Sequence, residues 1–347
     1  MINLQCDYLE GCHPLILEKM AEANYVKTPG YGKDPYCQSA AEKIKEVFAC
    51  PEAEIHFLVG GTQANLTVIA SLLRPHQGAL CAEEGHIATH ETGAIEATGH
   101  KVLPLPCKDG KITAEQVEIY CRQHFASTVQ EHTVQPGMVY ISFPTECGAL
   151  YSKAELEQLH AVCRAYEIPL YLDGARLGYG LASKENDLAP ADLARLCDIF
   201  YIGGTKCGAL FGEAVVIANA AYQKDFRYLI KQKGGMLAKG RMLGIQFDTL
   251  FTDGLYFEIC RKAVEQAAAL RRAFQERGVQ MYGDSPTNQQ FPILSKAQAE
   301  YLGQKYIYEI WGEYDETHTV VRFCTSWATG QEEIDGLLAY IQKMPEA

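Results

Sequence analysis

Long apolar runs are missing from this sequence of 347 residues, and none approaches the roughly 18 consecutive apolar residues that a membrane-spanning helix requires. The first residues, "MINLQCDYLEGCHP", include acids and lack the basic start and apolar core of a secretory signal. We therefore expect a globular, cytoplasmic protein without membrane contact.

Basic residues are in the minority, with 31 Lys and Arg against 43 Asp and Glu and a formal net charge of −12. Nucleic-acid binding depends on clustered positive charge, so this balance argues against a nucleic-acid partner. The one basic cluster, "FRYLIKQKGGMLAKGR" at 226–241, has two interpretations. It meets a single phosphate, or it is a solvated helix face followed by a glycine loop.

Several ligand-binding motifs are absent. The thirteen cysteines are scattered without a C-x-x-C pair, which argues against a disulfide framework and a zinc site, so we expect mostly buried thiols. Neither G-x-G-x-x-G nor a Walker loop occurs, so a dinucleotide or ATP is not indicated. We expect no metal site.

The middle of the chain alternates short β-branched or aromatic runs with longer segments of helical period. This pattern is typical of βαβ units and a parallel sheet. Thr113 with Gln116 and Ser152 with Glu155 each fit a capping box at the start of a helix. From about residue 253 a long helical segment precedes a smaller, more antiparallel set. We predict an α/β fold with a large domain over 1–250 and a small α+β domain over 251–347.

Three predicted strand ends carry groups that bind ligands. "LVGGTQANLT" places Gly60, Gly61 and Thr62 between a strand and a helix, where free N–H groups and the helix dipole favour an anion. Asp173 ends the strand "PLYLD", and Lys206 ends "IFYIGGTK". Ligands of open α/β sheets sit beyond the carboxyl ends of the strands, so we expect these groups to meet.

Each of these groups also has a purely structural interpretation. The glycine turn can be plain structure, and a half-buried Asp173 needs a positive partner, either Arg176 or a protonated heterocyclic nitrogen. Lys206 either reaches solvent or keeps a desolvated amine, whose lowered pKa suits it to nucleophilic use. The order of phosphate turn, aspartate and lysine favours the functional interpretation.

Five segments carry a resemblance to a known family: "GGTQAN", the H-x-x-x-x-E from His86 to Glu91, "DGAR" at 173–176, "TK" at 205–206 and "RFCTSW" from Arg322. In register over nearly the whole chain, they resemble the threonine aldolase and β-eliminating lyase family of pyridoxal-phosphate (PLP) enzymes. That family has the aspartate-aminotransferase type of fold, fold type I. The resemblance implies a mainly parallel sheet of the seven-stranded type in the PLP-binding domain.

The resemblance also implies roles for single residues. Lys206 would form the internal aldimine with PLP, Asp173 would pair with the pyridinium nitrogen, and His86 would stack on the ring and take part in proton transfer. The cofactor-binding set would be Gly60, Gly61, Thr62, His86, Asp173, Arg176, Thr205 and Lys206. The substrate carboxylate would lie between Arg176 and Arg322. The remaining substrate contacts would come from Cys6, from Tyr31 of a partner subunit and from His132.

The implied reaction is retro-aldol cleavage of L-threonine, L-allo-threonine or a related β-hydroxy-α-amino acid into glycine and an aldehyde, through an external aldimine that displaces Lys206. His86 is the first candidate for the base and His132 the second. The alternatives are β-elimination to a keto acid and ammonia, transamination on the same cofactor, and a PLP-fold binding protein without turnover.

The sequence departs from the family pattern around the substrate. Cys6 replaces the serine of a "SDT" motif, "SFPTECG" replaces "ENTHN", and Ser326 replaces the histidine of "VTH". Leu237 replaces the arginine of "GGGMRQ", which leaves Lys233, Lys239 and Arg241 as candidates to reach the phosphate across a subunit interface. These changes favour a related specificity. By analogy with the family, we expect a homodimer or homotetramer.

Overall fold

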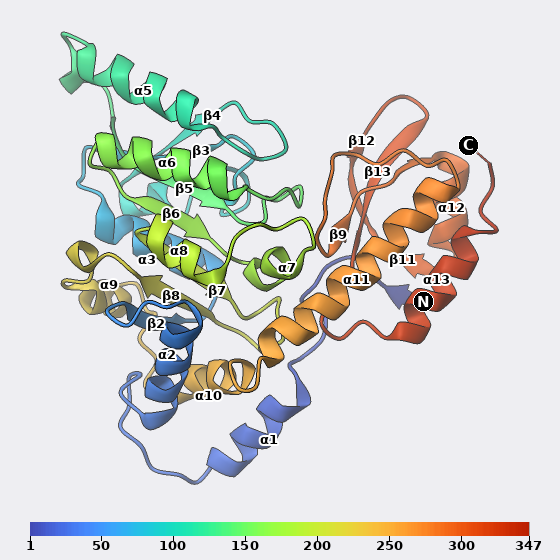
Figure 1. Ribbon diagram of the computed structural model, residues 1–347, viewed down its shortest axis with the longest axis horizontal. Helices are drawn as coiled ribbons and strands as arrows, with labels where there is room; N and C mark the ends of the chain where they lie inside the picture. The colour runs from blue at the N-terminus through green and yellow to red at the C-terminus, as the bar shows by residue number, and fades with distance from the viewer. Residues whose placement is uncertain (347) are drawn as a thin grey trace.

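A seven-stranded sheet forms the centre of the computed structural model, which describes residues 1–346 (Figure 1). The strand order is β2-β8-β7-β6-β5-β3-β4. β8 runs antiparallel to both of its neighbours, and the other neighbouring pairs are parallel, so the predicted mainly parallel sheet is confirmed. The strands are β2 (Glu54–Leu58), β3 (Gln77–Ala82), β4 (Lys101–Leu105), β5 (Gln135–Ser142), β6 (Leu170–Asp173), β7 (Ile199–Gly203) and β8 (Glu213–Ile217).

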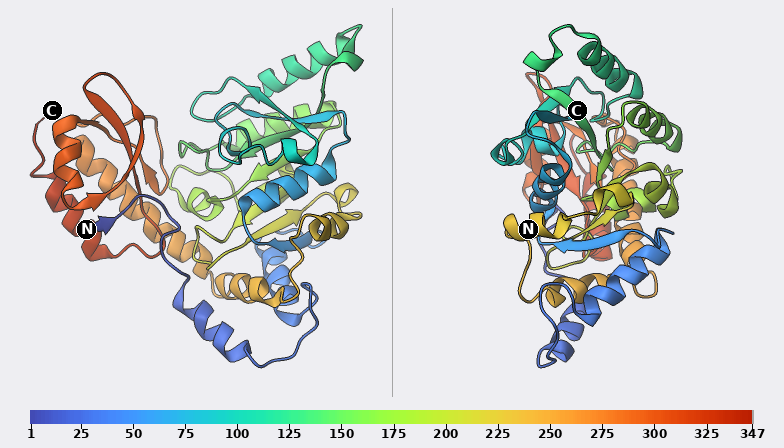
Figure 2. Two further views of the ribbon diagram at one scale, coloured as in Figure 1. Left: turned by 180° about the vertical axis from the view of Figure 1, so that it is seen from behind. Right: turned by 90° about the vertical axis from the view of Figure 1, so that its left-hand side faces the viewer.

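Helices cover both faces of this sheet, as Figure 2 shows. Alternate residues of a strand point to opposite faces, so Tyr140 packs on one side of β5 and Ile141 on the other. The Tyr140 side is covered by α3 (Gly61–Leu72), α4 (His86–Thr89) and α9 (Phe226–Gln232). The Ile141 side is covered by α2 (Pro35–Val47), α5 (Ala114–Ala126), α6 (Lys153–Ala165), α7 (Leu177–Ala182), α8 (Pro190–Leu196) and α10 (Arg241–Leu250).

Local sequence signals account for several helix starts. The predicted capping boxes are present: Thr113 begins α5 with Gln116, and Ser152 begins α6 with Glu155. In each, the side chains of both residues satisfy backbone N–H groups that the first helical turn leaves free. Three single turns complete the large part, at η1 (Glu96–Thr98), η2 (Gln130–His132) and η3 (Ala220–Tyr222).

The long helix α11 (Leu255–Glu276) leads from the large part into a smaller one (Figure 1). There an antiparallel sheet has the order β10-β13-β12, and β9 pairs with β13, so the smaller α+β part is present. Its elements are β9 (Gln289–Gln290), β10 (Ile293–Ser295), α12 (Lys296–Gly303), β12 (Glu309–Glu313), β13 (His318–Cys324) and α13 (Gln331–Ile341).

The N-terminal strand β1 (Ile2–Asn3) lies in this smaller part, where it pairs in parallel with β11 (Tyr306–Ile307). Leu4 is buried in the same hydrophobic cluster as residues of α11, α12 and α13. The sequence-based division places these first residues in the large domain. The sequence shows no sign of β1, because a strand of two residues is too short to show a period. After β1 the chain crosses to α1 (Pro14–Ala23), which lies at the edge of the large part (Figure 1).

The described residues contain no helix that is long and apolar enough to cross a membrane. Nor, within residues 1–346, do three or more His, Cys, Asp or Glu side chains gather in a way that could hold a metal ion. All thirteen cysteines of the sequence are free, and most are buried as expected.

Candidate active site

One cavity of about 220 Å³ lies at the carboxyl ends of the central strands. Eight residues predicted from the sequence line it: Gly60, Gly61, Thr62, His86, Asp173, Arg176, Thr205 and Lys206. They come from the ends of β2, β6 and β7 and from the segment after β3, because parallel strands deliver their carboxyl ends to the same edge of the sheet.

The start of α3 forms one wall of the cavity. Gly60 is the residue before the first turn, and Gly61 and Thr62 begin the helix. A Cβ added at Gly60 would meet no atom within 4 Å, whereas one at Gly61 would lie 3.0 Å from the Tyr201 hydroxyl oxygen. This helix start, with its unpaired N–H groups, lines the cavity and suits an anion such as a phosphate.

Asp173 is a buried carboxylate held by four hydrogen bonds. Oδ2 accepts from Tyr140 Oη at 2.6 Å and from Asn65 Nδ2 at 3.0 Å. Oδ1 accepts from Tyr201 Oη at 2.5 Å and from the Ala175 N–H at 3.0 Å. Burial alone would raise the pKa of Asp173, but the charge of His86 and these hydrogen bonds outweigh it and lower the pKa. The group stays ionised and suits a protonated ring nitrogen.

His86 is oriented by a carboxylate. Its Nδ1 lies 2.8 Å from Oε1 of Glu91, whose side chain is fully buried. Glu91 also accepts a hydrogen bond from Asn65, which bonds to Asp173 in turn. Burial alone would lower the pKa of His86, but the bond to Glu91 and the charges of Asp173 and Glu91 raise it. The ring therefore holds its proton more firmly than a free histidine.

Lys206 lies beyond the end of β7 with its amine at the cavity. Burial and the nearby charge of Arg176 lower its pKa, although Asp7 and Asp173 oppose the shift. The amine lies 5.9 Å from the centre of the Tyr8 ring. A lowered pKa increases the fraction of free amine, which is the form that attacks a carbonyl carbon.

Arg176 does not pair with Asp173, which was one interpretation of the sequence. Its Nε and one Nη instead bond both oxygens of the fully buried Asp7, at 2.7 and 3.0 Å. Asp7 also accepts from Asn288 at 2.9 Å. The second Nη of Arg176 makes no such bond within residues 1–346, so this side chain lines the cavity with one donor group free.

Arg322 lies on β13 in the smaller part and is 8% exposed. It donates to Gln289 Oε1 at 3.0 Å and to the Gln5 carbonyl at 3.1 Å, and it pairs with Glu309. Cys6 follows Gln5 and is buried. Neither Arg322 nor Cys6 contributes to the cavity wall, so both flank the site from the smaller part and the N-terminal segment.

The structure does not bring His132 to the site. His132 is exposed in η2, three residues before β5, whereas Ser142 at the other end of β5 lines the cavity. An eight-residue strand is roughly 25 Å long, so His132 lies at the opposite edge of the sheet. The expectation came from a loose match across a variable stretch, where spacing alone does not fix position.

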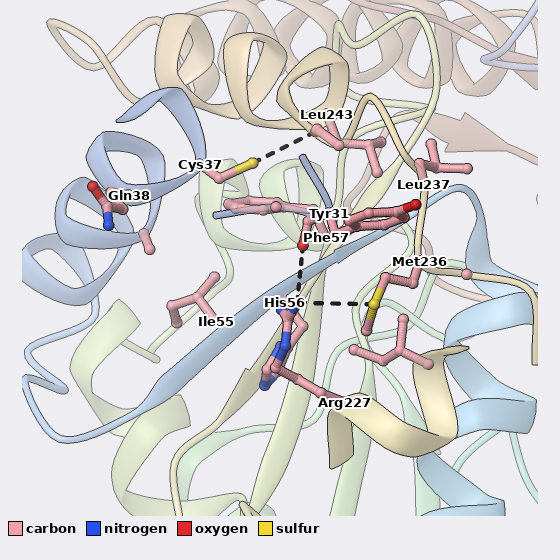
Figure 3. Close-up of a pocket in the computed structure, with 15 residues that line it drawn as sticks. Tyr31, Cys37, Gln38, Ile55, His56, Phe57, Arg227, Met236, Leu237 and Leu243 are labelled. Carbon is pink, nitrogen blue, oxygen red and sulfur yellow. Dashed lines mark hydrogen bonds between the residues drawn. The ribbon is translucent and has the colours of Figure 1, made fainter. Parts of the chain in front are cut away.

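Tyr31 lines a second pocket, together with residues of α2 and β2 (Figure 3). Its carbonyl accepts from Arg227 at 2.9 Å, and the Lys231 amine lies 4.9 Å from its ring centre. Leu237 lines the same pocket, and Arg241 is bonded to carbonyls of the segment after α1. Tyr31 is thus separate from the cavity of its own chain.

The cavity-lining residues that were not predicted include three with ionisable side chains: Tyr201, Glu213 and Glu146. Burial raises the pKa of Glu213 from 4.5 to about 8, although the hydrogen bond from the Gly204 N–H and the charge of Lys206 both lower it. Tyr201 is two residues before Gly203 on β7, and Glu213 begins the neighbouring strand β8. Because alternate residues of a strand face the same side, this spacing could have predicted both residues at the site. Glu146 lies in the "SFPTECG" segment, which departs from the family pattern but does not indicate that Glu146 lines the cavity.

The donor set fits PLP. A helix start with free N–H groups suits the phosphate, an ionised aspartate suits the ring nitrogen, and a free amine suits the aldehyde. All three line one cavity.

Comparison with known proteins gives consistent matches. The family model described as "Beta-eliminating lyase" matches residues 4–303. A low specificity L-threonine aldolase from Pseudomonas sp. (strain NCIMB 10558) is 29% identical over 347 residues, which cover 98% of this chain and 97% of that protein. The solved structure of Leishmania major threonine aldolase is 42% identical, covers 99% of each chain and superimposes with a TM-score of 0.96. An aromatic aminotransferase from Pyrococcus horikoshii, 16% identical with a TM-score of 0.70 and covering 99% of this chain and 95% of that one, shares the fold.

Proposed function

The chain belongs to the Beta-eliminating lyase family, and from this premise we propose that it is a PLP-dependent aldolase. Its substrate is L-threonine, L-allo-threonine or a related β-hydroxy-α-amino acid, which it cleaves into glycine and an aldehyde. The observation that carries the proposal is the single cavity that joins Lys206, Asp173 and the start of α3. The full-length similarity to threonine aldolases supports the carbon–carbon bond as the one that breaks.

Different residues hold different parts of the cofactor. Lys206 supplies the amine for covalent attachment, and Asp173 holds the ring nitrogen protonated. The phosphate is held by Gly60, Gly61 and Thr62 at the start of α3, with Thr205 nearby. Bound PLP supplies an electron sink for the pair released from the breaking Cα–Cβ bond.

The two arginines orient the substrate. The free Nη of Arg176 and the guanidinium of Arg322 bind the substrate carboxylate from the two parts of the chain, since a planar fork of donors matches that ion. Asp7 fixes the angle of Arg176 through two bonds. On the same N-terminal segment Cys6 is buried, and the Tyr8 ring centre lies 5.9 Å from the Lys206 amine.

The protein acts as a homodimer or homotetramer in the cytoplasm. Tyr25 and Tyr31 are 92% and 46% exposed, which leaves large apolar side chains for a second copy to cover. Such a contact would bring Tyr31 and the 231–241 loop to the partner's site. The abundance of free thiols suits a reducing compartment.

A product assay tests the proposal. Purified protein with added PLP is given L-threonine, L-allo-threonine, L-phenylserine and L-serine in turn, with Lys206→Ala as the inactive control. We expect glycine and the matching aldehyde from the first three substrates. Keto acid and ammonia instead would assign the chain to β-elimination, and a cofactor spectrum that responds to no amino acid would identify a binding protein.

A further inference from the structure

Glu146 presents a carboxyl group to the cavity that holding the cofactor does not use. Its Oε1 accepts from Ser142 Oγ at 2.8 Å and from the His86 backbone N–H at 2.9 Å. Its Oε2 is buried and has no hydrogen-bond partner within residues 1–346. The group is therefore fixed through one oxygen while the other remains without a partner.

Contacts through Gln289 place Glu146 on the side of the cavity that faces the smaller part. Gln289 Nε2 donates to the Glu146 carbonyl at 3.5 Å, and Gln289 Oε1 accepts from Arg322 at 3.0 Å. Arg322 is one of the two proposed carboxylate ligands. A substrate whose carboxylate binds Arg322 would therefore lie next to the segment that carries Glu146.

The structure leaves few other groups to act as base. His86 is bonded to Glu91 through Nδ1, and that bond together with the charges of Asp173 and Glu91 raises its pKa, so the ring favours the protonated form, which is not a base. His132 lies at the opposite edge of the sheet. The His90 ring centre lies 5.5 Å from that of His86 with the rings tilted by 50°, but His90 is not part of the cavity wall.

We propose that Glu146 takes the proton of the substrate's β-hydroxyl group, an inference that rests on the proposed aldolase function. A carboxylate oxygen of Glu146 forms the new O–H bond as the hydroxyl O–H bond breaks. The electron pair of that bond becomes the second bond of the aldehyde C=O. The Cα–Cβ pair passes to Cα, where the bound cofactor stabilises it. Glu146 returns the proton to solvent after the aldehyde leaves.

The electrostatics of Glu146 suit a base. Burial and the charge of Asp173 raise its pKa, although Ser142 and His86 oppose the shift. A carboxylate with a raised pKa is a stronger base than an exposed one, and cleavage should fall as the pH drops through that pKa. The ionisable groups whose charges act on or respond to Glu146 are His86, Asp173, Cys81, Tyr140, Cys147 and Tyr151.

The test compares Glu146→Gln with wild-type holoenzyme in two reactions. One is cleavage of L-threonine, measured as kcat and KM across a pH series. The other is exchange of the Cα protons of glycine with deuterated water, which involves no β-hydroxyl group. Glutamine can still accept from Ser142 and the His86 N–H. Glu84→Gln is the matched control. Glu84 is exposed, and its carboxylate contacts Cys147, which lies in the same loop as Glu146.

For Glu146→Gln we expect kcat for cleavage to fall about 100-fold or more, with KM and glycine exchange changed less than about threefold. The acidic limb of kcat/KM should disappear, Glu146→Asp should restore part of the rate, and Glu84→Gln should match wild type.

Three results would overturn the inference. Cleavage by Glu146→Gln at the wild-type rate would remove Glu146 from the proton transfer. An equal loss of cleavage and glycine exchange would show that Glu146 only maintains the site. A selective loss of cleavage in His90→Asn, with Glu146→Gln active, would move the role to His90. Wild-type protein that cleaves no β-hydroxy amino acid refutes the proposed function itself, before any variant is compared.

Discussion

Glu213 should make the stability of the cofactor-free protein fall as the pH rises. This side chain is 4% exposed at the start of β8, where its Oε2 accepts from the Gly204 N–H at 2.9 Å. Burial raises its pKa from 4.5 to about 8, so the folded protein keeps a proton that the unfolded chain loses near pH 4.5. Between these values the native state binds more protons, and stability decreases with increasing pH.

The size of the effect follows from the width of this pH window. Each pH unit contributes up to about 1.4 kcal/mol, so the window from 4.5 to about 8 corresponds to at most about 5 kcal/mol. Glu213→Gln removes the ionisable group and keeps an oxygen that can accept from Gly204. The variant should therefore differ little from wild type near pH 5 and be more stable by up to that amount near pH 9.

Urea denaturation of the cofactor-free proteins, followed by circular dichroism at several pH values, measures this difference. Glu42→Gln is the control, since Glu42 is an exposed glutamate on α2. Stability curves for Glu213→Gln and wild type that stay parallel from pH 5 to pH 9 would show that Glu213 ionises normally in the folded state. The reasoning from burial would then be wrong.

Three further variants test the site. Lys206→Ala should abolish both the absorbance of the imine between protein and PLP and all turnover, and any remaining turnover would refute the assigned attachment point. Asp173→Asn should leave PLP bound but slow cleavage by at least about 100-fold, whereas a normal rate would make Asp173 purely structural. Asp7→Asn leaves the Arg176 guanidinium without its buried counter-charge, so the free energy of unfolding should fall by about 3–5 kcal/mol in chemical denaturation. An unchanged midpoint would show that solvent compensates that charge.

The sequence predicts the fold well where secondary structure has a clear period or a cap. The alternation of apolar runs and helical segments predicts the parallel sheet, and the two capping boxes fix the starts of α5 and α6. The pairing of β1 with β11 was not predictable in this way, because two residues show no period and their partner is distant in sequence.

Prediction from the strand pattern found residues at strand ends that line one cavity. Asp173 ends β6, Gly61 and Lys206 lie three residues beyond β2 and β7, and parallel strands collect such residues at one edge. It failed for His132, because the number of residues in the variable stretch before β5 does not indicate which edge a side chain reaches. It missed Glu146, whose position depends on contacts with Ser142 and His86 that no local pattern encodes.

The place of β1 has a consequence for how the protein is made. Ile2 is synthesised well before its partner Tyr306, which lies about 300 residues later in the chain. Closing so long a loop is slow, so the N-terminal segment waits unpaired through most of translation. Asp7 lies on that segment and holds Arg176, so the site becomes complete only when the last third of the chain has emerged and folded.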